Sequence, residues 1–530
     1  MKNYKLYIFL VISVFFINLT TAQNPDWQWA KRGGGTVSLT GSSTFSWGLE
    51  RVIDLAIDSN DNYYFLTEVG AGQTDYDGTP IQTYSQNANR KDIFVFSTDC
   101  SGNFRWSKTI GGSFDDFATS IGIDTNNNVY ISGNTLNGPG APNPPHFDND
   151  SIKIAPASFG TPDDRLKNAF IIKYDDQGIF QWLREPEGAV PDFFNAKMQY
   201  TLVESNGSTH SLIKFREGTH LQGQLTISVG DSQSAIVVYD TNGNIEDFIE
   251  IDMQPGFDRY DYQLAYDANL NRYYLADTKR NANQVISING FGVSSGDDKS
   301  FYLAALDDQG QVLWYHENQR AQFWTLGDLV IDDNGDIYLT GMYFDKEING
   351  VGDSFAGYDF INNANMNPLS PFLIKLDSNG NLIWGSNATG SSRYPGRNIA
   401  IKGNDVYLGF GSLDNEWDSM AFATGIDGAG LVPNNIIVKL DKSTGNVLDI
   451  IEMQPDTFSQ DHIMAIGIDS QDNIVVGGYF GSQLLSGHPA GTLFKAGGDA
   501  DFFIAQYGQD CTLGVNDIAN NFGVKLYPQP

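Results

Sequence analysis

The sequence predicts an all-β fold, a seven-bladed β-propeller made of four-stranded antiparallel blades. Two strand-turn-strand patterns alternate along the chain, and a fragment of the second pattern at the N-terminus complements its last copy. Rings of six or eight blades are the alternatives, because the third and sixth units match the pattern least well.

The first pattern is an apolar strand, an Asp-rich turn and a second strand, as in Asp54-Leu-Ala-Ile-Asp-Ser-Asn-Asp-Asn-Tyr-Tyr-Phe65. The other clear copies begin at Ser120, Asp328 and Ala465, and the weaker copies begin near Tyr200, Gln263 and Asn398. Each copy is expected to supply the two inner strands of one blade.

The second pattern is a buried strand, a turn and an aromatic strand, as in Phe170 to Trp182. Its relatives are Asp92 to Lys108, Ala235 to Phe248, Phe301 to Trp314, Phe372 to Trp384 and Ile436 to Ile450. A seventh copy begins at Phe502 and lacks its last strand. The segment Asp26 to Gly34 resembles that missing strand, so we expect it to complete the last blade and to remove the exposed sheet edges of an open array.

The strand cores are continuous apolar runs, as expected when both faces of a sheet are covered. Asp or Asn opens each turn, and glycines such as Gly178 and Gly380 supply the positive φ that tight turns require. After the N-terminal segment we find no sustained helical period, which argues against a helical fold.

Composition and the N-terminus bear on location and partners. The 64 acidic and 32 basic residues give a net charge of -32, which repels nucleic acid and anionic lipid. Lys2 and Lys5 precede an apolar run that ends at Phe16, and small residues lead to Ala22. Residues 1–22 are therefore predicted to be a signal peptide. A membrane anchor fits less well because the run is short, and no later segment of the mature chain is apolar enough to span a membrane.

The chain has two cysteines, Cys100 and Cys511, at equivalent turn positions of blades that a closed ring would make neighbours. A disulfide requires the Cα atoms to approach within about 7 Å. Because adjacent blades diverge at their outer turns, we expect free thiols, with a disulfide that reinforces ring closure as the alternative.

Two family resemblances follow from these motifs. The segment Ile110-Gly-Gly-Ser-Phe-Asp-Asp116, followed by Ile121 to Asp124 and Asn128-Val-Tyr-Ile-Ser-Gly133, resembles the SBBP bacterial β-propeller repeats. That resemblance covers about Asp26 to Leu513, so residues 23–512 are expected to form the propeller. Residues 513–530, ending in Tyr527-Pro-Gln-Pro530, resemble a linker and the truncated start of a C-terminal sorting domain, which implies the type IX secretion machinery as a partner.

Long connections between the second and third strands should gather on one face of the ring and could carry binding residues. The candidates for stacking on sugar rings are Trp324, Tyr343 and Trp417, with loop anchoring as the alternative for each. Glu50, Asp116 and Asp461 stand eight residues before the strand aspartate of their blades and could hold Ca²⁺. Capping of the entering loop is the favoured alternative, because four blades lack an acid there.

No catalytic constellation stands out. The Asp-x-Asn-x-Asn turns lack the twelfth-position Glu of an EF-hand, and the six histidines lack zinc-binding spacing. The sequence therefore favours a secreted or surface-located binding module for a glycan or a protein. The alternatives are a propeller enzyme that acts on extracellular glycans, as a hydrolase or lyase, and a structural scaffold or adhesin.

Overall fold

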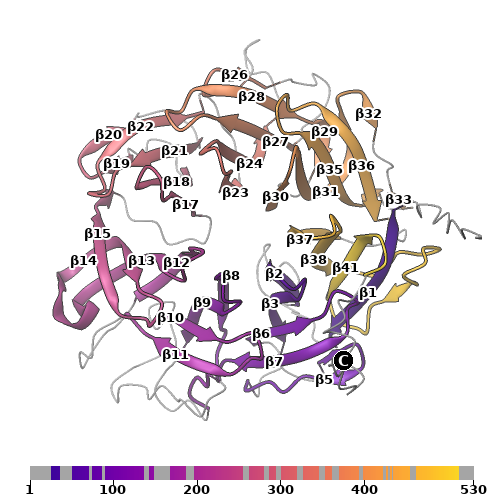
Figure 1. Cartoon of the computed structure of the whole chain (residues 1–530), viewed down its shortest axis with the longest axis horizontal. Coiled ribbons are helices and arrows are strands. Elements are labelled where there is room, and N and C mark those ends of the chain that lie inside the picture. Colours follow the sequence, from indigo (N-terminus) through magenta and orange to yellow (C-terminus); the bar gives the residue numbers. More distant parts are fainter. Residues whose placement is uncertain are drawn as a thin grey trace, which may run out of the picture.

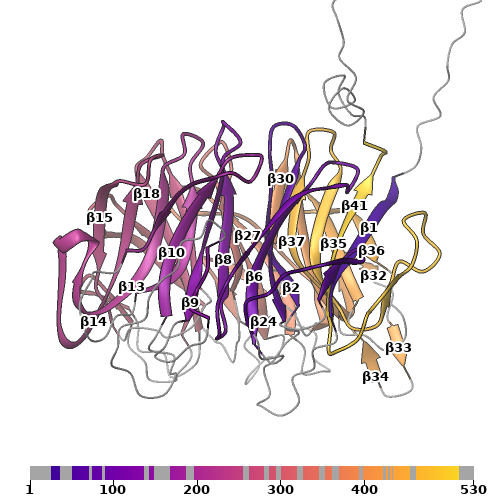
Figure 2. The same cartoon turned by 90° about the horizontal axis from the view of Figure 1, so that it is seen from below.

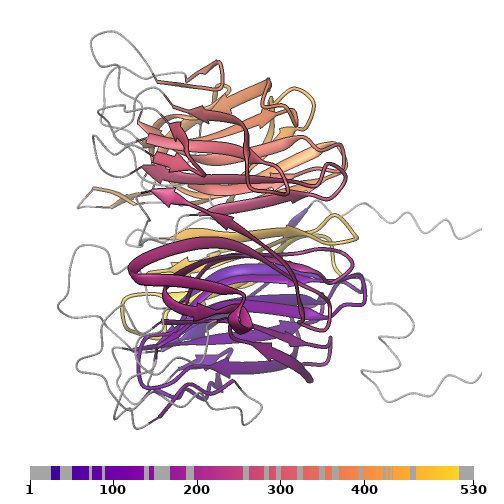
Figure 3. The same cartoon turned by 90° about the vertical axis from the view of Figure 1, so that its left-hand side faces the viewer.

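The computed structural model of the chain is a ring of antiparallel β-strands around a central axis (Figure 1). The strands run between the two faces of the ring (Figures 2 and 3). The structure describes residues 25–35, 50–70, 74–85, 90–136, 143–147, 167–186, 196–254, 262–279, 286–293, 300–318, 326–344, 353–360, 369–392, 398–421, 425–427, 430–432, 434–453 and 461–511. These ranges contain many strands and no α-helix, so the predicted all-β class is confirmed.

The strands pair in sets of four, which we call units and number from β2. The first three units are β2(Arg51–Ile57), β3(Tyr63–Gly70), β6(Lys91–Thr98) and β7(Phe104–Ile110); β8(Phe117–Ile123), β9(Val129–Leu136), β10(Lys167–Tyr174) and β11(Phe180–Arg184); and β12(Ala196–Val203), β13(Thr209–His220), β14(Leu225–Tyr239) and β15(Ile245–Ile251).

The remaining units are β17(Gln263–Asp267), β18(Arg272–Lys279), β21(Ser300–Leu306) and β22(Val312–Glu317); β23(Leu326–Ile331), β24(Ile337–Phe344), β27(Leu369–Leu376) and β28(Leu382–Asn387); β30(Asn398–Lys402), β31(Asp405–Trp417), β35(Asn434–Asp441) and β36(Val447–Met453); and β37(His462–Ile468), β38(Ile474–Phe480), β41(Asp501–Gly508) and β1(Asp26–Gly34). Within each unit we call the strands A to D from the axis outward.

Short additional strands lie within the connections between strands B and C. They are β4(Asp75–Tyr76), β5(Thr79–Pro80), β19(Ile286–Ile288), β20(Phe291–Val293), β25(Ser354–Phe355), β26(Tyr358–Asp359), β32(Met420–Ala421), β33(Gly425–Asp427), β34(Gly430–Val432), β39(Gln483–Leu484) and β40(Leu493–Phe494). Two further strands follow strand D of their units: β16(Met253–Gln254) pairs with β19, and β29(Thr389–Ser392) links units five and six. In unit three, β13 and β14 instead form one long hairpin.

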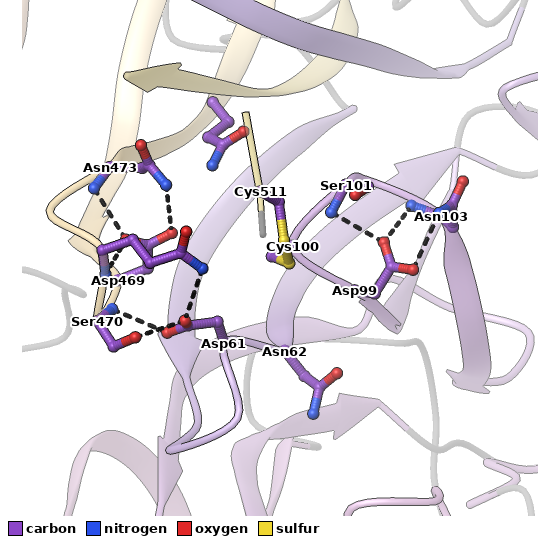
Figure 4. Close-up of a disulfide and its surroundings, with 12 residues drawn as sticks. Asp61, Asn62, Asp99, Cys100, Ser101, Asn103, Asp469, Ser470, Asn473 and Cys511 are labelled. Atoms are coloured by element: carbon purple, nitrogen blue, oxygen red, sulfur yellow. Dashed lines mark hydrogen bonds between the residues drawn. A yellow bond between two sulfur atoms is a disulfide. The ribbon is translucent and has the colours of Figure 1, made fainter. Parts of the chain in front are cut away.

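Strand β1 pairs antiparallel with β41, from Asp26 opposite Gly508 to Gly33 opposite Phe502. It therefore lies where the sequence predicted the missing outer strand. The inner strands also touch in order: β2 contacts β8, and contacts continue through β12, β17, β23, β30 and β37 back to β2. Near that last contact Ser470 donates hydrogen bonds to Asp61 of unit one (Figure 4).

Burial explains the apolar runs seen in the sequence. Every residue of β3, β6, β9 and β21 is buried, whereas the outer strand β7 is exposed at its first residue and half-buried over the next four. Strands B and C are thus covered on both faces by neighbouring units, and strand D meets solvent. Apolar burial of this kind is the main stabilising contribution to the ring.

Cys100 and Cys511 form a disulfide, with their Cα atoms 5.8 Å apart, so the expectation of free thiols was wrong (Figure 4). Two local features bring the cysteines together. The Trp29 indole donates a hydrogen bond to the Cys100 carbonyl, which holds the turn of unit one against the outer strand of unit seven. Cys511 follows β41 in the chain segment that leaves the sheet, and it packs with the same apolar cluster as Cys100 and Trp29.

Candidate functional site: a closed turn face and an acidic loop face

The connections from strand A to B and from C to D are short and lie on one side of the ring, which we call the turn face. In the turn after β27, Asp377 Oδ1 accepts the amides of Asn379 and Asn381 at 2.8 and 2.9 Å, and Oδ2 accepts the Asn381 side chain at 2.8 Å. The same three bonds recur at Asp58, Asp99, Asp124, Asp240 and Asp469. Both oxygens of each aspartate are thus committed to its own turn, as hairpin chemistry requires.

A tryptophan on strand D joins five of the units to the next one. The Trp384 indole donates to the Lys442 carbonyl at 3.0 Å, in the turn of the following unit. Gly445 of that turn packs against the Trp384 indole, and a Cβ added to this glycine would stand 2.6 Å from the indole. The equivalent donor and acceptor pairs are Trp29 with Cys100, Trp106 with Asp176, Trp182 with Thr241 and Trp314 with Ser378.

Units three and six carry exposed aspartates, Asp247 and Asp449, in place of this tryptophan. At the first of these junctions Asn289, in the turn between β19 and β20, donates to the Gly310 carbonyl at 2.6 Å. These are also the two units whose sequences match the repeat least well. The loss of one aromatic residue therefore accounts for part of their departure from the pattern.

The opposite side, which we call the loop face, carries the B to C connections and the segments that enter each unit. The three entering acids are buried there. Glu50 accepts the amides of Gly35 and Gly70 at 2.7 and 3.3 Å, and Asp116 accepts those of Gly112 and Leu136 at 2.9 and 2.8 Å.

Asp461, also fully buried, accepts the Gly481 amide at 3.1 Å. These bonds are the capping role that the sequence offered as the alternative to calcium binding. The described residues contain no group of three or more His, Cys, Asp or Glu side chains placed to hold a metal ion.

Asp116 faces a second buried carboxyl group, that of Asp92 at the second position of β6. The position that a Cβ on Gly111 would take lies 2.5 Å from Asp92 Oδ1 and 2.8 Å from Asp116 Oδ2. Burial raises the pKa of Asp92 to about 7. Burial, with the Asp92 charge as the next cause, raises the pKa of Asp116 as well. Two acids thus meet across a residue that must be glycine.

Asp501 and Glu50 repeat this arrangement at the junction of units seven and one. A Cβ on Gly34 would stand 2.9 Å from both Asp501 Oδ1 and Glu50 Oε2. Here Arg32 forms ion pairs with Asp501 at 3.1 Å and with Asp75 at 2.9 Å. Burial still raises the pKa of Glu50 to about 7 and that of Asp501 to about 6.

Two inner-strand acids join neighbouring units near the axis. Asp54 Oδ2 accepts the Ile121 amide at 3.0 Å, and Asp328 Oδ2 accepts the Ile399 amide at 2.9 Å. Burial raises the pKa of Asp54 to about 7 and that of Asp328 to about 6. Because each carboxylate bonds to the next strand A, these residues act in ring assembly.

The aromatic candidates are not exposed. Tyr343 and Trp417 are each 0% exposed, with the Tyr343 hydroxyl bonded to the Ala388 carbonyl and the Trp417 indole bonded to Ser386. Both rings anchor the chain, so neither presents a face to a sugar. Trp324 lies outside the described residues.

Sequence reasoning missed Asp92 and Asp501. Asp92 stands seven residues before Asp99, the first residue of the C to D turn of unit one. Asp501 is the first residue of strand C in unit seven, seven residues before Gly508, and the other units carry Asn, Ser or Gln at the matching position. An acid in an otherwise apolar strand was the available signal. Only the fold shows that each one lies opposite an entering acid of the next unit.

Comparisons with known proteins agree with this fold. The family described as SBBP, beta-propeller repeat, matches residues 105–140, which extend from β7 to just beyond the end of β9. An uncharacterized WD repeat-containing protein, L264 of Acanthamoeba polyphaga mimivirus, is 34% identical over 92 residues, 17% of this chain and 6% of that protein. The chain thus spans a small part of that relative. The two matches support a β-propeller repeat protein.

Among solved structures, polysaccharide lyase Uly1 has a TM-score of 0.41 at 8% identity, covering 92% of this chain and 100% of that chain. The quinohemoprotein alcohol dehydrogenase from Comamonas testosteroni has a TM-score of 0.37 at 10% identity, covering 92% and 77%. BamB from Moraxella catarrhalis has a TM-score of 0.32 at 11% identity, covering 81% and 96%. Their different activities give no guide to the activity of this chain.

Proposed function

We propose that this chain is an exported binding protein, a closed seven-bladed β-propeller that takes an extracellular glycan or protein on its loop face. The observation that carries the proposal is the contrast between the two faces. On the turn face, short turns bond to themselves and to the next unit. The long B to C connections leave and re-enter the sheets on the other face, as binding loops on a rigid scaffold do.

Three features support seven blades and closure. Four-stranded pairing repeats through all units, β1 completes the sheet of β41, and inner-strand contacts return from β37 to β2. The Cys100–Cys511 disulfide adds a covalent link across the same junction. A ring held in this way fixes the positions of the strand ends from which the B to C connections leave.

Export is supported by that disulfide and by the N-terminal signal-like segment, which lies outside the described residues. Disulfides persist mainly in oxidising compartments. No helix among the described residues is long and apolar enough to cross a membrane. The high negative charge disfavours nucleic acid and anionic lipid as ligands.

The test is a binding screen of residues 23–530 against glycans, polysaccharides and extracellular proteins, with turnover assayed in parallel. Three variants replace one B to C connection each by a short Gly-Ser linker, at residues 137–166, 345–368 or 422–433. The matched control is Asn379→Ala on the turn face, where only the backbone of Asn379 is used.

At least one loop variant should lose binding while keeping its melting temperature, and the control should bind normally. Loss of binding only in turn-face variants would contradict the assignment of the face. Turnover of a bound glycan would show that the chain is an enzyme rather than a binding protein.

A further inference from the structure

Asp92 and Asp116 form a buried acidic pair without a cation. Both side chains are 0% exposed, and neither forms an ion pair with a described lysine or arginine. Gly111 separates them, and each has one oxygen within 3 Å of the place where a Cβ on that glycine would stand. Two buried carboxylates this close repel one another, and such pairs commonly retain one proton.

The hydrogen bonds of the two groups are unequal. Asp116 accepts a backbone amide on each oxygen, from Gly112 and Leu136. Asp92 Oδ2 accepts the amides of Tyr84 and Ser85, whereas Asp92 Oδ1 is buried with no hydrogen-bond partner. An ionised Asp92 would leave a buried anionic oxygen without a donor, which is strongly unfavourable.

The charged groups nearby are already paired. Asp115 pairs with Arg90 at 2.5 Å. Lys91, beside Asp92 in sequence, pairs with Glu68 at 2.5 Å, and Glu68 also pairs with Arg51 at 3.1 Å. Asp115 adds negative charge near both members of the acidic pair. Because these lysine and arginine side chains already pair with other acids, protonation of one carboxylate is the way in which the charge of the acidic pair can be reduced.

The junction of units six and seven offers an internal comparison. Asn434 stands seven residues before the turn aspartate Asp441, as Asp92 stands seven before Asp99, and Asp461 enters the next unit as Asp116 does. An asparagine presents an N–H donor where a protonated aspartic acid presents an O–H donor. The chain thus uses a neutral, donor-bearing residue at the matching position.

We propose that Asp92 carries a proton on Oδ1, directed toward the Asp116 carboxylate, and that this proton makes the pair a pH-sensitive clasp on the loop face. The clasp holds three segments together: residues 84–85, Gly111–Gly112 directly after strand D, and the end of β9 at Leu136. It does not depend on the ligand of the proposed function.

The direction of the pH effect follows from the proton. Burial raises the pKa of Asp92 from 3.8 to about 7, so the folded chain binds this proton more tightly than the unfolded chain. The stabilisation is complete below about pH 4 and is lost as the pH rises through about 7. Asp92→Asn keeps a donor at this position and removes the titration.

The test compares urea unfolding of the full chain and of Asp92→Asn from pH 4 to pH 9. Relative to the wild type, the folding equilibrium constant of the variant should rise by about tenfold per pH unit between pH 4 and 7 and then level off. Amide exchange in peptides covering residues 84–85 and 111–136 should increase with pH beyond the intrinsic rate in the wild type only. Identical pH profiles for the two proteins would overturn the proposal.

Two further variants test whether the proton resides on Asp92. Asn434→Asp should create a new loss of stability at high pH, because it builds a second acid opposite an entering acid. Asp116→Asn should destabilise at every pH, since the asparagine oxygen can replace only one of the two carboxylate oxygens and the NH₂ group cannot accept the other backbone amide. Equal behaviour of Asp92→Asn and Asp116→Asn would contradict the assignment of the proton to Asp92. If added Ca²⁺ stabilises the wild type at pH 8 and does not stabilise Asp92→Asn, a metal ion rather than a proton neutralises the pair, and the proposal is wrong.

Discussion

The turn face and the loop face are built by opposite ends of the same strands, but they satisfy polar groups in different ways. On the turn face each aspartate bonds within its own turn, and strand D tryptophans bond to the next unit. On the loop face two pairs of acids are buried, and some of their amide donors come from another strand, as Leu136 at the end of β9 does for Asp116. The turn face is therefore locally encoded and repetitive, whereas the loop face depends on which connections meet there.

The largest effect should come from breaking a tryptophan contact of the turn face. Trp384→Ala removes a ring that is 7% exposed and its bond to the Lys442 carbonyl. We expect a loss of about 3 to 5 kcal/mol in the free energy of unfolding, measured by denaturant titration.

The matched control is Asp449→Ala, at the equivalent exposed position of unit six, which should change stability by about 0.5 kcal/mol or less. Comparable losses in both variants would show that the tryptophan contacts do not distinguish these junctions. Trp384→Phe should fall between the two, because it keeps most of the packing and loses the hydrogen bond.

Removing the disulfide should have the next largest effect. Cys511→Ser opens a link between residues 411 apart in sequence. Constraint of the unfolded chain by such a bond is worth about 2 to 4 kcal/mol. The melting temperature of the oxidised wild type should exceed that of the variant. A reducing agent should lower the melting temperature of the wild type and leave that of the variant unchanged. An unchanged melting temperature would mean that β1 pairing with β41 is sufficient to hold this junction.

A turn aspartate should have a smaller effect. Asp377→Ala removes three hydrogen bonds from an exposed turn, at a cost of about 1 kcal/mol. Although partial burial opposes the charge, the bonds from Asn381 and Asn379 hold the pKa of Asp377 below its usual value. Its contribution is therefore present above about pH 4 and is lost as the pH falls further, which acid titration of wild type and variant would reveal. A stability difference that is constant across this range would contradict the role of the ionised form.

The smallest effect on stability is expected on the loop face. Replacing residues 422–433, which include β33 and β34 at the edge of the ring in Figure 2, should change the free energy of unfolding by about 0.5 kcal/mol or less. Inserting two glycines after Ser378 on the turn face should cost more, because this separates the Ser378 carbonyl from the Trp314 indole. Equal losses in the free energy of unfolding for these two variants would show that the two faces do not differ in their contribution to stability.

Much of the ring was predictable because its signals are local. The turn pattern of Asp377 to Asn381 specifies a hairpin through bonds within five residues, and alternating patterns of this kind located most strands. The resemblance of Trp27 and Trp29 to the ending of unit one placed the N-terminal strand beside β41. The long hairpin of β13 and β14 was not predicted, because the sequence shows only a weak copy of the first pattern near Tyr200 and the second pattern from Ala235 to Phe248.

The sequence by itself determined the strands, the turns and the partner of the N-terminal strand, because each depends on the order of residues within a short segment. The tertiary structure alone decided that Tyr343 and Trp417 are buried, that Cys100 and Cys511 meet, and that Asp92 lies opposite Asp116. These outcomes depend on the rotation between one unit and the next. That rotation is set by packing across whole sheet faces, which no short segment of the sequence specifies.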